Sequence, residues 1–195
     1  MPKRLLLLPC FLVLSALAFV ACGSGGNEDS KVEEVIETAA ASNDPADCKK
    51  LQTQKFTEQA SHKSGGGAVM RCEEEAEEIE GVEAATVSNV KVDGSNATAR
   101  VALRGGTLNG QAVEVALVKS GDQWKLDEIV EFTKFDEQKL VEGLERELEE
   151  NSNGVSAEFA ACFTEAFSQG GEQEVEELLL SPASGEVEGV AKHCA

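Results

Sequence analysis

The apolar residues of this 195-residue chain change their spacing twice, and this limits the possible folds more than any other feature. Up to about residue 80 they recur every three or four positions, as on one face of a helix. From Val82 to Phe132 they recur mainly at every second position, as in strands with one buried face. From Asp136 onward the helical spacing returns. This order predicts an α+β protein in which N-terminal helices pack on a curved antiparallel sheet and a small all-α module follows.

The middle of the chain predicts four strands. Residues 96–104 alternate most cleanly, with Ala97, Ala99, Val101 and Leu103 on one side. Similar segments lie at 85–92, 111–119 and 123–132. The turn sequences DGSN and SGD join the first two and the last two strands, which predicts a meander. Within the first strand, one spacing breaks the alternation, since Val87 and Val90 are out of phase, and this predicts a bulge.

Helices are predicted on both sides of the strands from apolar spacing and from capping residues. Asp29 and Ser30 can cap the first helix, and Asp44 before Pro45 can cap a short second one. The predicted helices cover about 30–41, 45–51, 68–81, 136–149, 156–169 and 172–180, with a last turn near the C-terminus.

The first 22 residues have the layout of an export signal. Lys3 and Arg4 precede the uncharged run Leu5–Val20, which is shorter than the roughly 20 residues of a spanning helix. A signal peptide over 1–21 is therefore favoured over a permanent membrane helix. An alternative cleavage position follows the ALA sequence at 16–18.

The sequence FVAC, which spans the predicted end of the signal and Cys22, resembles a bacterial lipobox, although Leu is more usual where Phe19 stands. The resemblance implies that the thiol of Cys22 carries a lipid and that the protein lies on the extracytoplasmic face of the cell membrane. The alternative is that Cys22 is only a cysteine near a cleavage site. The glycine- and serine-rich start of residues 22–29 predicts a flexible tether.

The chain is strongly acidic. It has 17 basic and 36 acidic residues, and loss of Lys3 and Arg4 with the signal leaves 15 − 36 = −21. Such a charge repels nucleic acid and anionic headgroups. Nucleic-acid partners are therefore excluded, and lipid rather than surface charge is expected to hold the protein at a membrane.

Cysteine usage predicts an oxidising compartment. Cys10 leaves with the signal and Cys22 is assigned to lipid, so four cysteines remain: Cys48, Cys72, Cys162 and Cys194. An even number in an exported chain suggests disulfides, and four cysteines allow three pairings. Pairing of sequence neighbours matches the boundaries of the predicted segments, but the sequence alone does not choose.

The order of three helices and a bent sheet is similar to the nuclear transport factor 2-like cone fold of many lipoproteins of high-GC Gram-positive bacteria. The sequences DPADCKKL, RCEEEAEEIEG, ATVSNVKVDGSNATARVAL and VKSGDQWKLDEI carry the resemblance. It implies a cone domain over 30–134 and favours a Cys48–Cys72 pair. Residues 135–195 then form the helical C-terminal module, which resembles small cysteine-paired helical modules of envelope proteins.

Candidate chemistry is sparse. The chain has no Tyr and two histidines, of which His62 is expected in a solvated glycine-rich loop and His193 near the C-terminus. Trp124 is a candidate pocket residue, although a strand tryptophan is more often core. No metal or cofactor motif occurs, because close Cys or His pairs and calcium-binding loops are missing.

An apolar cone without an acid–base set favours a non-enzymatic protein that binds a small apolar ligand or an envelope protein. An envelope hydrolase or isomerase on the same fold, and an assembly factor acting through the C-terminal helices, are the alternatives.

Overall fold

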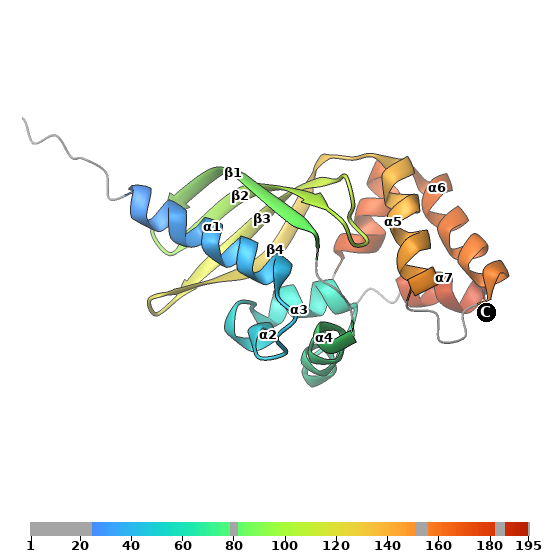
Figure 1. Cartoon of the computed structure of the whole chain (residues 1–195), viewed down its shortest axis with the longest axis horizontal. Coiled ribbons are helices and arrows are strands. Elements are labelled where there is room, and N and C mark those ends of the chain that lie inside the picture. The colour runs from blue at the N-terminus through green and yellow to red at the C-terminus, as the bar shows by residue number, and fades with distance from the viewer. Residues whose placement is uncertain (1–24, 79–81, 151–155, 182–185, 195) are drawn as a thin grey trace, which may run out of the picture.

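The computed structural model describes residues 25–78, 82–150, 156–181 and 186–194 (Figure 1). The sheet lies toward one end of the long axis, and a group of C-terminal helices forms the other end. The predicted signal peptide and Cys22 fall outside the described residues. The observed architecture is α+β, as predicted: N-terminal helices, a four-strand antiparallel sheet, then C-terminal helices.

The four strands follow one another in the sheet order β1-β2-β3-β4, which confirms the predicted meander. Their bounds are Ala84–Asp93 (β1), Asn96–Arg104 (β2), Ala112–Ser120 (β3) and Gln123–Lys134 (β4). The predicted bulge is present in β1, where the register shifts between Ser88 and Lys91. Asn89 in this bulge has a φ of 54°, a left-handed conformation that Asn tolerates better than most residues.

Helix α1 (Gly25–Ala41) runs along the sheet and buries Val32 and Ile36 against it (Figure 1). The flexible tether predicted over 22–29 is therefore wrong for 25–29, which are helical. Two glycines make this turn a poor helix by propensity. Contacts of Glu28 with the sheet offset that cost, as described below.

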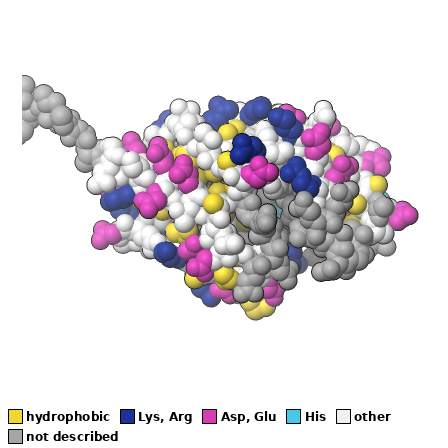
Figure 2. All heavy atoms as spheres, in the orientation of Figure 1, with side chains coloured by type: hydrophobic (Ala, Val, Ile, Leu, Met, Phe, Trp, Pro, Cys, Tyr) yellow, Lys and Arg dark blue, Asp and Glu magenta, His cyan; other side chains and the backbone are white. Residues whose placement is uncertain are grey.

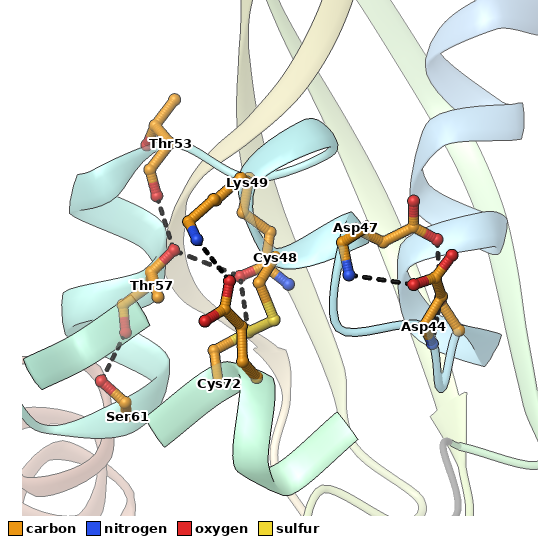
Figure 3. Close-up of a disulfide and its surroundings, with 12 residues drawn as sticks. Asp44, Asp47, Cys48, Lys49, Thr53, Thr57, Ser61 and Cys72 are labelled. Carbon is orange, nitrogen blue, oxygen red and sulfur yellow. Dashed lines mark hydrogen bonds and ion pairs between the residues drawn. A yellow bond between two sulfur atoms is a disulfide. The ribbon is translucent and has the colours of Figure 1, made fainter. Parts of the chain in front are cut away.

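Three short helices follow α1: α2 (Asp47–Lys50), α3 (Gln54–Ser61) and α4 (Gly66–Glu78). A disulfide between Cys48 and Cys72 joins α2 to α4 (Figure 3). Beside it, the ammonium of Lys49 lies 2.5 Å from a carboxylate oxygen of Glu73. Helix α3 was not predicted from the sequence, which gave a short helix at 45–51 and a glycine-rich loop around His62 and assigned no structure in between.

Three helices complete the chain: α5 (Glu137–Glu150), α6 (Ala157–Leu180) and α7 (Glu186–Cys194). The two predicted helices at 156–169 and 172–180 are the halves of α6, which meet at a kink where Gly171 has a φ of 70°. The last predicted turn is helix α7, and the Cys162–Cys194 disulfide joins it to α6.

The sheet and the C-terminal helices contribute to one apolar core. Its members include Val32 and Ile36 of α1, Val101, Val113, Leu117 and Trp124 of the sheet, and Leu140, Phe167 and Val175 of the C-terminal helices. The predicted boundary at 134/135 thus falls between β4 and α5, while side chains on both sides of it pack together. The separate C-terminal module over 135–195 stays a prediction.

The edge of β4 that faces away from β3 is covered by the chain before and after the sheet. Leu126 donates its N–H to the Leu51 carbonyl and accepts from the Thr53 N–H, both at 2.8 Å. Farther along β4, the Phe132 N–H donates to a carboxylate oxygen of Glu176 at 2.8 Å, which ties α6 to the sheet.

Between these points, the side-chain amide of Gln59 takes the place of a neighbouring strand. It accepts the Ile129 N–H at 2.7 Å and donates to the Ile129 carbonyl at 2.8 Å. It also donates to the Leu180 carbonyl at the end of α6, at 2.5 Å. Gln59 is 3% exposed, so this one buried amide connects α3, β4 and α6.

Candidate functional site

The first turn of α1 is the described segment nearest in sequence to Cys22, and Glu28 fastens it to the sheet. One carboxylate oxygen of Glu28 accepts from the ammonium of Lys119 at 2.6 Å and from the indole N–H of Trp124 at 3.0 Å. The other accepts from Lys31 at 2.7 Å. These hydrogen bonds, with that from Lys119 the strongest, lower the pKa of Glu28 from 4.5 to about 2.

Because the pKa of Glu28 is lowered on folding, its ion pairs stabilise the folded state above pH 4.5 and lose this effect as pH falls toward 2. Glu28→Gln is therefore expected to lower stability at neutral pH, and the difference from wild type should shrink between pH 4.5 and pH 2. Urea unfolding at a series of pH values measures this. Glu33→Gln, at an exposed position on the same helix, is the control, and a Glu28→Gln difference independent of pH contradicts the assignment.

Trp124, the predicted pocket residue, belongs to the core. Its side chain is 1% exposed, its N–H is used by Glu28, and the ammonium of Lys119 lies 5.5 Å from its ring centre. The helix-facing side of the sheet around it is occupied by the protein's own apolar side chains. Trp124 lines neither of the two hollows described next.

A groove of about 700 Å³ lies between α6 and α7. Val175, Leu178 and Val190 supply apolar surface, and Val175 is buried while the other two are half-buried. Glu174 and Glu177 line the same groove and are exposed, one turn apart on α6. The Cys162–Cys194 disulfide links the two helices that form the groove. The groove therefore combines apolar surface and negative charge on two covalently linked helices.

A second hollow of about 420 Å³ lies at the β1 bulge, on the side of the sheet that carries its charged residues. Asn89, Lys91, Arg100, Glu114 and Thr133 line it, and Arg100 and Glu114 stand opposite each other on β2 and β3. The hydroxyl of Thr133 is buried without a hydrogen-bond partner. Cations and an anion lie together here, so the hollow shows no preference for one sign of ligand charge.

The two histidines lie on different elements, His62 at the end of α3 and His193 in α7. His62 ends α3 with a φ of 51°, and burial, with Lys63 nearby, lowers its pKa. It is half-buried rather than solvated as predicted, and its Nδ1 has no hydrogen-bond partner. His193 is exposed beside Cys194. Across the described part of the chain, no group of three or more His, Cys, Asp or Glu side chains is placed to hold a metal.

Sequence reasoning identified the cysteines but missed Glu28, Gln59 and the α6–α7 groove. The four cysteines form the neighbour pairs Cys48–Cys72 and Cys162–Cys194. Glu28 and Gln59 acquire their partners only through tertiary contacts, and no local pattern distinguishes them from other acidic or amide residues. An acidic pair at i and i+3 was visible in Glu174 and Glu177, but its apolar neighbours come partly from another helix.

Two disulfides are typical of oxidising compartments and suggest an extracytoplasmic location. Among the helices that the structure describes, none is long and apolar enough to cross a membrane. Comparisons with protein-family models, with curated proteins and with solved structures find no match to this chain.

Proposed function

We propose that this is a lipid-anchored protein of the bacterial cell envelope that binds another envelope protein and does not catalyse a reaction. The signal-like N-terminus ending at Cys22 and the two disulfides support the location in the cell envelope. The groove between α6 and α7 is the single observation that carries the binding function.

A protein partner is favoured over a small apolar ligand by the way the apolar surface is distributed. The helix-facing side of the sheet, where a cone would hold a ligand, is filled by residues such as Trp124, Leu126 and Phe132. The α6–α7 groove instead leaves Leu178 and Val190 half-exposed next to two carboxylates. An apolar floor with a charged rim is the usual composition of a protein-binding surface.

The partner segment expected in this groove carries an apolar side chain flanked by Lys or Arg. The apolar side chain would pack on Val175, Leu178 and Val190, and the cation would face Glu174 and Glu177. Such charge complementarity speeds association and selects partners as well as adding affinity.

Charge reversal in the groove tests this proposal with a fluorescent amphipathic peptide of Leu and Lys as probe. Glu174→Lys with Glu177→Lys is expected to weaken peptide binding at least about tenfold, which corresponds to about 1.4 kcal/mol. Fluorescence anisotropy measures the affinity, and a Leu–Glu peptide should not bind the wild type.

The matched control is Glu33→Lys with Glu37→Lys, which makes the same change of net charge at exposed positions of α1. This control should keep its affinity within about twofold, or about 0.4 kcal/mol. Equal weakening in both double variants means that the peptide follows net charge, and the groove then has no part in binding.

The anchor is tested by Cys22→Ser in a bacterial host. The wild type is expected in the membrane fraction with an acylated Cys22 in its intact mass, since two or more acyl chains give stable anchoring. The variant should lose the acyl mass and leave the membrane fraction. A wild-type mass without acylation rules out the lipid anchor.

A further inference from the structure

We propose that the end of the molecule formed by the first turn of α1, the β1–β2 turn and the β3–β4 turn faces the bilayer, and that α5–α7 stand away from it. This inference rests on the proposed lipid anchor at Cys22. It goes beyond the anchor because it assigns one surface of the folded protein to the lipid headgroups. Figure 1 shows the start of α1 at one end of the long axis and α5–α7 at the other.

The reach of the anchor follows from chain length. Helix α1 begins at Gly25, three residues after Cys22. Three residues span at most about 11 Å even when fully extended. A lipidated Cys22 at the membrane surface therefore keeps the first turn of α1 within about that distance of the headgroups.

The hydrogen bonds of Glu28 extend this limit on the distance from the membrane from α1 to the sheet. Glu28 binds Lys119 and Trp124, which stand on either side of the β3–β4 turn. The backbone N–H of Lys119 also donates to the carbonyl of Ser95 in the β1–β2 turn, at 2.8 Å. Both hairpin turns are thus fixed beside the start of α1, so the short reach of the anchor applies to all three.

The side chains at this end suit the headgroup layer rather than the hydrocarbon core. The turn segments 93–96 and 120–123 have the sequences DGSN and SGDQ, without an apolar side chain. Inserting their backbone and carboxylates into hydrocarbon would be costly. The end is therefore expected to rest on the membrane surface without entering it.

The distribution of charge determines how the long axis of the molecule is oriented relative to the membrane. Residues 135–195 contain three basic and fifteen acidic residues, a net charge of 3 − 15 = −12, and the charged side chains visible at the α5–α7 end of the molecule are acidic (Figure 2). An anionic leaflet repels this end within about one Debye length, roughly 8 Å at physiological salt. Helix α1 alone is about 25 Å long, so the α5–α7 end lies beyond this range when the long axis of the molecule is roughly perpendicular to the membrane. In this orientation the α6–α7 groove also points away from the lipid.

Fluorescence quenching tests the orientation with the acylated full-length protein in vesicles. A fluorophore is attached through Asp122→Cys, in the β3–β4 turn, or through Gln173→Cys, on α6; both positions are exposed. The vesicles are phosphatidylcholine containing a headgroup nitroxide lipid, with or without phosphatidylglycerol. The label at 122 should be quenched at least about twofold more than the label at 173, since only the first lies beside the short anchor segment.

Two further measurements sharpen the test. Adding phosphatidylglycerol should reduce quenching at 173 further, and raising the salt concentration should reverse this reduction. A flexible Gly-Ser insertion between Ser24 and Gly25 should reduce quenching at 122, because it lengthens the reach.

The outcomes separate the anchor from the orientation. If the intact mass shows acylated Cys22 but the label at 173 is quenched as strongly as that at 122, or the insertion changes nothing, the orientation is wrong and the anchor stands. If Cys22 is not acylated, the anchor and the orientation are both overturned.

Discussion

Gln59→Leu is expected to lower the free energy of unfolding by about 3 kcal/mol or more. Leucine fills a similar volume but cannot pair with the three backbone groups that the amide satisfies, which are the N–H and carbonyl of Ile129 and the carbonyl of Leu180. A buried polar group left without a partner costs about 1–3 kcal/mol. Urea unfolding, with and without the substitution in a Cys22→Ser background, measures the loss.

Gln54→Leu is the matched control. Gln54 lies on the same helix, is exposed and bonds only to the side chain of Glu58, so its replacement should change stability by about 0.5 kcal/mol or less. If the two variants are equally stable, the amide of Gln59 does not hold α3, β4 and α6 together.

Removing the second disulfide through Cys162→Ser and Cys194→Ser is expected to lower the free energy of unfolding by up to about 4 kcal/mol, the chain-entropy value for a loop of this length. The loss should be concentrated in α7. None of the side chains described at 189–194 is fully buried, and an isolated helix shorter than about 12 residues is marginal in water. Hydrogen exchange of the α7 amides measures this, and they should lose their protection.

The corresponding change at the other disulfide, Cys48→Ser with Cys72→Ser, is the comparison. A similar global loss of about 3–4 kcal/mol is expected from its loop length, but α7 should stay protected. Protection of α7 that survives in the Cys162→Ser, Cys194→Ser variant shows that side-chain packing, rather than the disulfide, holds the last helix.

The sheet could be predicted from the sequence because its alternating pattern is long and one face is buried. Residues 96–104 set the register of the centre of the sheet, and the phase break between Val87 and Val90 located the bulge. In these segments, the side chains that define the pattern are also the ones that pack in the core, so local and tertiary preferences agree.

Helix α3 could not be predicted because its stability is tertiary. It has eight mostly polar residues, QKFTEQAS, and too few apolar positions to show a period. Its start depends on the Thr53 side chain, which accepts the Phe56 N–H at 3.2 Å, and its position depends on the buried amide of Gln59. Neither feature separates it from an ordinary polar loop when only the sequence is read.

The start of α1 was missed for the same reason. Gly25 and Gly26 favour a flexible segment, and the sequence does not show that Glu28 will meet Lys119 and Trp124 some 90 residues later. The α6–α7 groove likewise depends on how two helices approach each other. The involvement of the four cysteines in disulfides was predictable because their even number and the expected compartment limit the choices, whereas the choice among the three pairings depends on which helices meet.

The covered edge of β4 has a consequence under the proposed lipid anchor, which would concentrate the protein in the plane of a membrane. A bare edge strand can add a strand from a neighbouring molecule and begin aggregation. Here the outward backbone groups of Leu126, Ile129 and Phe132 already have partners from Leu51, Thr53, Gln59 and Glu176. On the opposite edge, the bulge at Asn89 and the exposed charge of Lys91 interrupt β1. Many copies can therefore be packed side by side without joining their sheets.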